Sequence, residues 1–277
     1  MHTLWIDAVA WWSPSLPDWQ RARAALRGET AAAAAEATLS ARPAPALLAA
    51  NERRRAPDSV LMALEVASRA AAESGHDLAT LATVFASAHG DLPITDALCR
   101  TLAADPLLLS PTRFHHSVHN AASGYWAIGS GSPAASSALS AHEHTFAAGW
   151  MEAACQCQAD GQPVMLVAYD TEAVGALASV NRSRGLLAVA IVLSPVQGPR
   201  SQWAVDWHLH SAAVSMPIAH TAAAQALRAN ASAAALPLMQ ALAAGQDTEL
   251  AWPLSGELAL LLQLRKPPSA GSGSPAA

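Results

Sequence analysis

Charged residues are scarce in this sequence: Asp, Glu, Lys and Arg together make up only 13% of its 277 residues. A typical soluble protein has about a quarter. The net charge is −5, and Arg53, Arg54 and Arg55 form the only basic run. Nucleic-acid binding needs a clustered positive surface, so the sequence argues against it. The longest apolar run, residues 186–193, is far too short to cross a bilayer, so we expect no membrane span.

Cysteine is scarce as well, with Cys99, Cys155 and Cys157 the only three in the chain. A small, odd number in a chain of this length is typical of a reducing compartment without structural disulfides. The first twelve residues contain Asp7 and lack the basic start of a secretory signal. We therefore expect a cytoplasmic protein.

Hydrophobic residues, many of them alanine, make up 52% of the sequence. A chain with so few charges either buries an unusual amount of surface or presents an apolar face to a partner, and we favour the partner interface. The length suffices for one large domain, which we expect over residues 1–265. Residues 266–277 form a Pro/Gly/Ser tail that is too broken to pack, and we expect it to be disordered.

Short β-branched runs alternate with helical patterns along the chain. Helix 51–75 is the clearest, with Asp58 as a plausible N-cap and Gly75 as a plausible C-cap. Ser110, Pro111 and Thr112 are expected to end the helical unit that follows. We expect strands at 3–11, 81–87, 162–170, 185–193 and 203–210, and a strand or turn at 134–139. We expect helices at 96–105, 118–126, 142–158 and 221–242, and a strand or helix at 258–264. This order predicts an α/β fold with strands buried between helical layers.

A metal site is one candidate function. His115 and His119 are spaced i, i+4 and would share one face of a helix, as metal ligands require. No HExxH pattern occurs, however, and no carboxylate stands in a recognised zinc pattern. Caps, core positions and interfaces explain these histidines more simply, so we expect no metal. The relaxed GxGxxA at Gly129, Gly131 and Ala134 contains a proline, which makes a nucleotide cofactor equally unsupported.

Nucleophilic catalysis is the other candidate. The segment GSGSP at residues 129–133 has a proline where a hydrolase elbow has its last glycine. Each cysteine lies within an expected helix, away from the helix N-terminus or nearby cation that activates a thiolate. Neither pattern predicts a catalytic centre.

A resemblance gives the sequence its most specific interpretation. The segment 110–124, containing FHHSVHNAASG, resembles the part of β-ketoacyl synthases that lies near their dimer interface and pocket. Residues 138–152 resemble the helix that begins at the synthase nucleophile, and 164–170 the strand after it. The likeness extends over residues 4–193 and is strongest to the short chain-length factors of aryl-polyene gene clusters. It implies a thiolase-like layered α-β-α fold, with the N-terminal half present and the remainder truncated.

The departures from the family bear on function. Counting back along the helix that contains Gly149 puts the nucleophile position near Ala141, and no cysteine is near it. The active enzymes also need two histidines in glycine-rich motifs, whereas His208, His210 and His220 lack those glycines. The chain is expected to end too early for a complete second half of the fold. These absences imply that no acyl-enzyme forms on this chain.

The resemblance thus implies a non-catalytic partner that forms a heterodimer with a full-length β-ketoacyl synthase. It would shape the tunnel for an acyl chain carried on an acyl carrier protein. The residues expected to line the pocket or the interface are Phe114, His119, Asn120, Tyr125, Trp126, His142, Phe146 and Trp150. The alternative is a stand-alone acyltransferase or hydrolase that uses Ser140 or His142.

Overall fold

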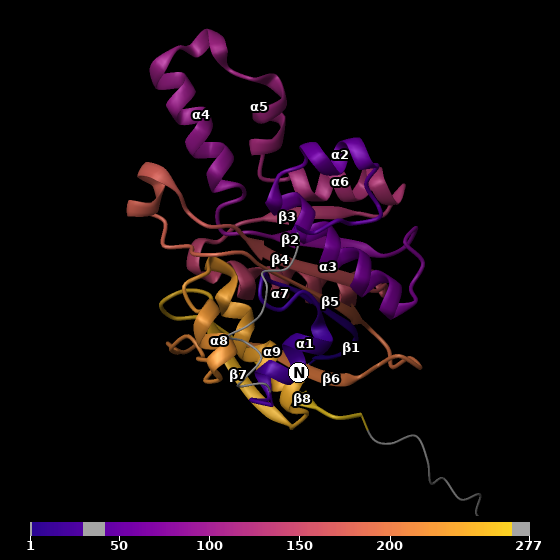
Figure 1. The fold of residues 1–277 in the computed structure, drawn as a ribbon. Helices are drawn as coiled ribbons and strands as arrows, with labels where there is room; N and C mark the ends of the chain where they lie inside the picture. Colours follow the sequence, from indigo (N-terminus) through magenta and orange to yellow (C-terminus); the bar gives the residue numbers. More distant parts are fainter. Residues whose placement is uncertain (1, 30–41, 268–277) are drawn as a thin grey trace, which may run out of the picture.

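The computed structural model describes residues 2–29 and 42–267, which fold around one eight-stranded sheet (Figure 1). The strands are β1 (His2–Trp12), β2 (Ala82–Ala86), β3 (Ser136–Leu139), β4 (Val164–Asp170), β5 (Leu187–Ser194), β6 (Trp203–His210), β7 (Thr248–Pro253) and β8 (Ala259–Arg265). Their order is β3-β2-β4-β5-β1-β6-β8-β7. Strands β3, β2 and β4 run parallel, and every other neighbouring pair is antiparallel.

The helices lie on both faces of this sheet, as the predicted α-β-α layering requires. They are α1 (Trp19–Leu26), α2 (Ala50–Arg55), α3 (Asp58–Ser74), α4 (Leu92–Ala104), α5 (Pro111–Ser117), α6 (Ala121–Ser130), α7 (Thr145–Asp160), α8 (Ala222–Leu227) and α9 (Leu236–Ala244). The 3-10 turns are η2 (Pro106–Leu108), η3 (His142–His144), η4 (Gly175–Ser179) and η5 (Ala231–Ala235). One core contains side chains of α1, α7, η5 and α9, and the other contains those of α3 and α6. The predicted α/β class is confirmed.

A β-bulge at Asp7 shifts by one residue which side chains of strand β1 face each core. Leu4 and Ile6 before the bulge face the same core as Val9 and Trp11 after it, although strict alternation would separate them. The Asp7 side chain is buried and accepts hydrogen bonds from Ser201 Oγ (2.7 Å) and from Ser194 Oγ, while His76 Nε2 lies 2.8 Å away. These partners offset the cost of burying the carboxylate.

The predicted helix 51–75 is wrong in one respect. The chain breaks at Ala56 and Pro57, so α2 and α3 are separate, and Pro57 rather than Asp58 is the N-cap of α3. A proline restricts the residue before it to extended backbone, which ends the first helix. Gly75 is the C-cap, as predicted, with the left-handed φ of 70° that glycine tolerates.

Other boundaries also differ from the predictions. Helix α4 begins at Leu92 rather than 96, because Asp91 caps it through a 2.8 Å bond from the Ile94 amide. Ser110 and Pro111 begin α5 instead of ending a unit, with Ser110 as N-cap. The expected helix 118–126 begins three residues later, as α6, and residues 118–120 separate it from α5. Helix 142–158 opens as the 3-10 turn η3.

The alanine-rich stretch 221–242 was predicted as one helix and is three short ones, α8, η5 and α9. Asn230 starts η5 by accepting the Ser232 amide (2.9 Å), and such side-chain bonds compete with helix continuation. Strand β7 was missed altogether, and 258–264 is the strand β8. Residues 30–41 and 268–277, which include most of the expected disordered tail, lie outside the described residues. In the described part of the chain, no helix is both long and apolar enough to cross a membrane.

Candidate functional site

The carboxyl ends of the three parallel strands meet at one edge of the sheet. Ligands of open α/β sheets bind at such edges. His89 follows β2, the turn 140–144 follows β3, and Asp170 ends β4. The site is built from these three segments, together with residues 180–183 after β4 and residues 216–237 of the C-terminal part.

The turn after β3 is a strained strand-to-helix elbow. Among the described residues, His142 is the one non-glycine residue with a positive φ, at 52°. The turn is held by Thr145 Oγ1, which donates to the His142 carbonyl (2.6 Å) and accepts from the Ala141 amide (2.9 Å). Such elbows lift one side chain out of the fold toward a reactant. Here the lifted side chain is the exposed His142 imidazole, one residue beyond Ala141.

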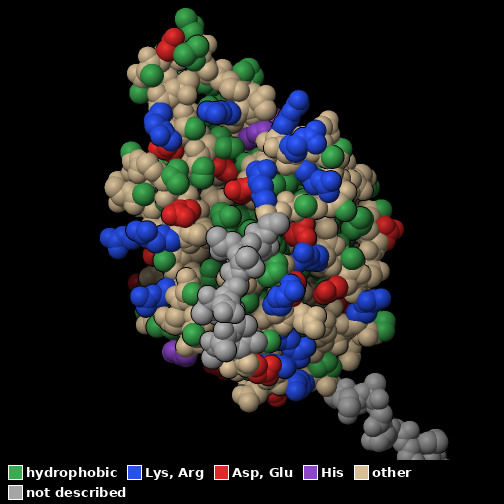
Figure 2. Space-filling view, viewed as in Figure 1, with side chains coloured by type: hydrophobic (Ala, Val, Ile, Leu, Met, Phe, Trp, Pro, Cys, Tyr) green, Lys and Arg blue, Asp and Glu red, His purple; other side chains and the backbone are tan. Residues whose placement is uncertain are grey.

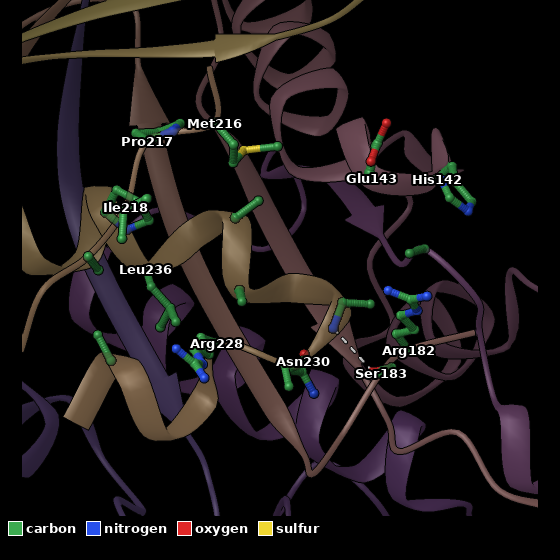
Figure 3. Close-up of a pocket in the computed structure, with 18 of the residues that line it drawn as sticks. His142, Glu143, Arg182, Ser183, Met216, Pro217, Ile218, Arg228, Asn230 and Leu236 are labelled. Atoms are coloured by element: carbon green, nitrogen blue, oxygen red, sulfur yellow. Dashed lines mark hydrogen bonds between the residues drawn. The ribbon is translucent and has the colours of Figure 1, made fainter. Parts of the chain in front are cut away.

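A cavity of about 800 Å³ opens beside this elbow (Figure 3). His89 and His142 line one side of it, with ring centroids 6.1 Å apart, and Glu143 lies next to them. Arg182 and Arg228 line it from two different loops. The remaining wall is largely apolar and comes from Met216, Pro217, Ile218, Ala219, Ala224 and Leu236. The cavity therefore combines charged and apolar surfaces.

Asp170 holds the floor of the site together. Its carboxylate accepts hydrogen bonds from Ser87 Oγ (2.8 Å), Ser232 Oγ (2.7 Å) and the amides of Ala88 and His89 (both 3.2 Å). The side chain is 1% exposed, and burial raises the pKa of this carboxyl against the opposing effect of the serine hydrogen bonds. Asp170 thereby joins the segment after β2 to η5.

The predicted pocket and interface residues divide by burial. Phe114 is 58% exposed on α5, and Asn120 is also exposed. Tyr125 is half-buried, and its hydroxyl lies 2.9 Å from His116 Nε2. The three other aromatic candidates are buried in the two cores of this chain: Trp126, Phe146 and Trp150. Burial within the chain removes these three from the surface that a partner can reach.

The histidines do not form the face that the i, i+4 spacing suggested. His115 lies on α5, but His119 lies beyond its end and donates from Nε2 to the Ser87 carbonyl (2.8 Å). The shared helical face predicted for the two histidines is therefore wrong, because Val118 interrupts the helix. No cluster of three or more metal-binding side chains occurs among residues 2–29 and 42–267.

The nucleophile candidates have unsuitable surroundings. Burial, followed by the charge of Asp7, raises the pKa of the Cys157 thiol to about 12, and burial and Glu152 raise the pKa of Cys155. A reactive thiol needs the opposite shift. The Ser140 hydroxyl donates to the Ala88 carbonyl (2.9 Å). In the described part of the chain no histidine or carboxylate bonds to it, although a serine nucleophile needs such a base.

Sequence reasoning missed the half of the cavity that lies after β4. Arg182, Ser183, Arg228 and Asn230 belong to irregular segments without a motif, and they reach the elbow only through the fold. The available signal was indirect: three predicted strands that end in polar residues indicate a site if those strands are parallel.

The family described as "beta-ketoacyl synthase, N-terminal domain" matches residues 19–256. This chain belongs to that family. A comparison with curated proteins found no match.

Solved structures with the same fold include three complexes. The first is the ketosynthase ApeO in complex with its chain length factor ApeC, from Xenorhabdus doucetiae. One chain of this complex is 22% identical, with a TM-score of 0.68, and the match covers 95% of this chain and 100% of that one. The ishigamide ketosynthase/chain length factor is 14% identical with a TM-score of 0.66, over 95% and 99%. AntDE:AntF, a type II acyl-carrier protein with its ketosynthase bound to the hexaketide, is 9% identical with a TM-score of 0.73, over 96% and 99%. The chain therefore has the thiolase-like ketosynthase fold.

Proposed function

We propose that this chain is a chain-length factor. It would bind an active β-ketoacyl synthase as a heterodimer and shape the tunnel in which an acyl chain, held on an acyl carrier protein, grows in polyene or fatty-acid-type biosynthesis. The observation that carries the proposal is the strained elbow, which on a ketosynthase fold presents the His142 imidazole and no thiol. Two of the similar structures are ketosynthases with chain length factors, which supports the same role.

The surface of the chain supports a partner. Residues 92–118, here called the arm, comprise α4, η2 and α5 and project from the body of the molecule (Figure 1). Hydrophobic side chains are visible on this projection in Figure 2. The exposed large ones are Leu102 (51%), Leu107 (92%), Leu108 (72%), Phe114 (58%) and Val118 (40%). A group of exposed apolar side chains on one projecting segment is typical of a protein interface.

The edge of the sheet next to the site offers a second contact surface. Strand β3 pairs with β2 on one side only, and none of the described strands pairs with its other side. Unpaired amides and carbonyls of an edge strand accept a strand from another chain. A partner that covers both this edge and the arm would bury the exposed Phe114.

Co-purification tests the proposal. The chain is co-expressed with candidate β-ketoacyl synthases, and any complex is isolated through a tag on the ketosynthase. We expect a one-to-one complex, and we expect Leu107→Asp and Phe114→Asp to raise the dissociation constant at least about tenfold, because a buried unpaired charge is costly. If the chain never co-purifies with any such ketosynthase, the proposal fails.

Val196→Asp is the matched control. Val196 is also exposed (70%), but it follows β5. Because β5 runs antiparallel to β4, its carboxyl end lies at the other end of the strands from the start of the arm. This variant should bind the ketosynthase like the unmodified chain. Equal weakening by all three aspartates would show a general effect of added charge rather than an interface at the arm.

The alternative function, an acyltransferase or hydrolase that uses Ser140 or His142, has less support because the Ser140 hydroxyl is bonded to a backbone carbonyl. It predicts that the isolated chain hydrolyses acyl thioesters and that Ser140→Ala or His142→Gln abolishes this activity. The chain-length-factor proposal predicts the same slow background rate for all three proteins.

A further inference from the structure

The cavity beside the elbow has a use that does not depend on a nucleophile. We propose that it binds an amphipathic anion: an apolar chain that ends in a single carboxylate or phosphate. Its volume of about 800 Å³ lies within the roughly 300–1,000 Å³ typical of small-molecule sites.

Charge is the first argument. Among the residues that line the cavity, Arg182 and Arg228 are cationic and Glu143 is the one acidic residue, so the lining carries a formal charge of 2 − 1 = +1 with the histidines neutral. The whole chain, by contrast, carries −5. No salt bridge joins either arginine to a carboxylate of the described residues, and both arginines are exposed. The Arg228 guanidinium donates to the neutral Gln225 amide oxygen (3.3 Å). An unpaired guanidinium is suited to a carboxylate or phosphate.

Apolar side chains supply the rest of the wall. Met216, Pro217, Ile218 and Leu236 line it, and Ile218 is 66% exposed. Figure 3 shows Met216, Pro217 and Ile218 on the side of the cavity away from Arg182. Burying a ligand chain against these side chains contributes about 25 cal/mol for each Å² removed from water.

The two loops that bear the arginines are fixed to each other. The Arg184 amide donates to the Ala229 carbonyl (2.9 Å), and the Ala231 amide donates to Ser183 Oγ (3.1 Å). Asn230 Nδ2 donates to the Gly185 carbonyl (3.0 Å). Arg182 and Arg228 thus each stand within two residues of this hydrogen-bonded junction. A preorganised site loses less free energy on binding than a flexible one.

Calorimetric titration of the isolated full chain tests the proposal with three probes of equal chain length: octanoate, octyl phosphate and octanol. We expect at least one anion to bind about tenfold or more tightly than octanol, because a charge-assisted hydrogen bond contributes that much. A preference for octanoate identifies a carboxylic acid as the natural ligand class, and a preference for octyl phosphate identifies a phosphate ester.

Variants locate the binding. Arg182→Gln and Arg228→Gln should each weaken anion binding about tenfold or more and leave octanol binding unchanged. Arg54→Gln removes an exposed arginine outside the cavity and should have no effect. Glu143→Gln removes the acidic group, whose side chain is 71% exposed, and should tighten anion binding up to about fivefold, a gain that misfolding cannot produce.

Three results would overturn the proposal: octanol binding as tightly as both anions, the Arg182/Arg228 double variant retaining full affinity, or no anion binding below about 1 mM. The experiment contains no ketosynthase. Its failure would therefore leave the chain-length-factor proposal standing, and failure of co-purification would leave this site standing.

Discussion

Replacing Asp170 by asparagine should destabilise the whole chain, because this one carboxylate joins the two halves of the site. Four donors converge on it: two serine hydroxyls and the amides of Ala88 and His89. Asparagine has only one acceptor oxygen, and its NH₂ group would face two donors that it cannot accept from. The serine hydroxyls can rotate to other acceptors, but the two backbone amides cannot.

The magnitude follows from those amides. The Ala88 amide donates to one carboxylate oxygen and the His89 amide to the other, so the single asparagine oxygen keeps one amide and leaves the other unpaired. A buried donor left without a partner costs about 1–3 kcal/mol. Asparagine also avoids the burial of a charge, a burial that raises the pKa of the Asp170 carboxyl. This relief offsets part of the cost, and we expect a net loss of about 1–2 kcal/mol.

Urea unfolding of the isolated chain measures this loss, with Asp160→Asn as the control. Asp160 is exposed at the end of α7, so its replacement should change the free energy of unfolding by no more than about 0.5 kcal/mol. If Asp170→Asn unfolds at the same urea concentration as the control, the carboxylate is not the junction described above.

Three further predictions concern pH, packing and thiol reactivity. The pKa of Asp170 is raised in the folded state, so the folded chain binds this proton more tightly than the unfolded chain does. The difference in unfolding free energy between the unmodified chain and Asp170→Asn should therefore shrink as the pH rises above about 4, which urea titrations at several pH values would measure. Gly149→Ala should lower the free energy of unfolding by about 1–3 kcal/mol, because the new Cβ would lie 2.8 Å from the Ala86 Cβ. Gly124→Ala is the control: its Cβ would meet open space, so it should stabilise α6 by about 0.5–1 kcal/mol. At pH 8 a thiol reagent should modify the exposed Cys99 in the native chain and leave the buried Cys157 unmodified until urea is added; rapid native labelling of Cys157 would contradict its high pKa.

The layered fold was predictable because the strongest patterns are local. The alternation in 203–210 and the buried run ending at Asp170 mark strands wherever they pack, and both were placed correctly. The prediction of where the helices break failed for a different reason. At Pro57 and Asn230, single residues that stop a helix outweigh many that favour one, and alanine-rich sequence shows no periodicity by which to locate the break.

The site was only half predictable. The turn between β3 and α7 follows from one strand and the helix after it, but no sequence pattern indicated the strained backbone of His142. The nucleophile position near Ala141 stays a prediction. Arg182 and Arg228 could not be found, because their proximity to the elbow depends on the order of strands in the sheet. Nor could burial separate Phe114 from Trp150 before the packing was known.

The proposed chain-length factor would assist condensation without performing it. The most direct measurement is mass spectrometry of the acyl groups formed on the carrier protein by the reconstituted pair, with the ketosynthase either intact or with its nucleophilic cysteine replaced by alanine. The account predicts extended acyl chains of defined length from the intact pair and no extension from the pair with the altered ketosynthase. Extension by the altered pair would contradict the account, because the nucleophile would then have to lie on this chain.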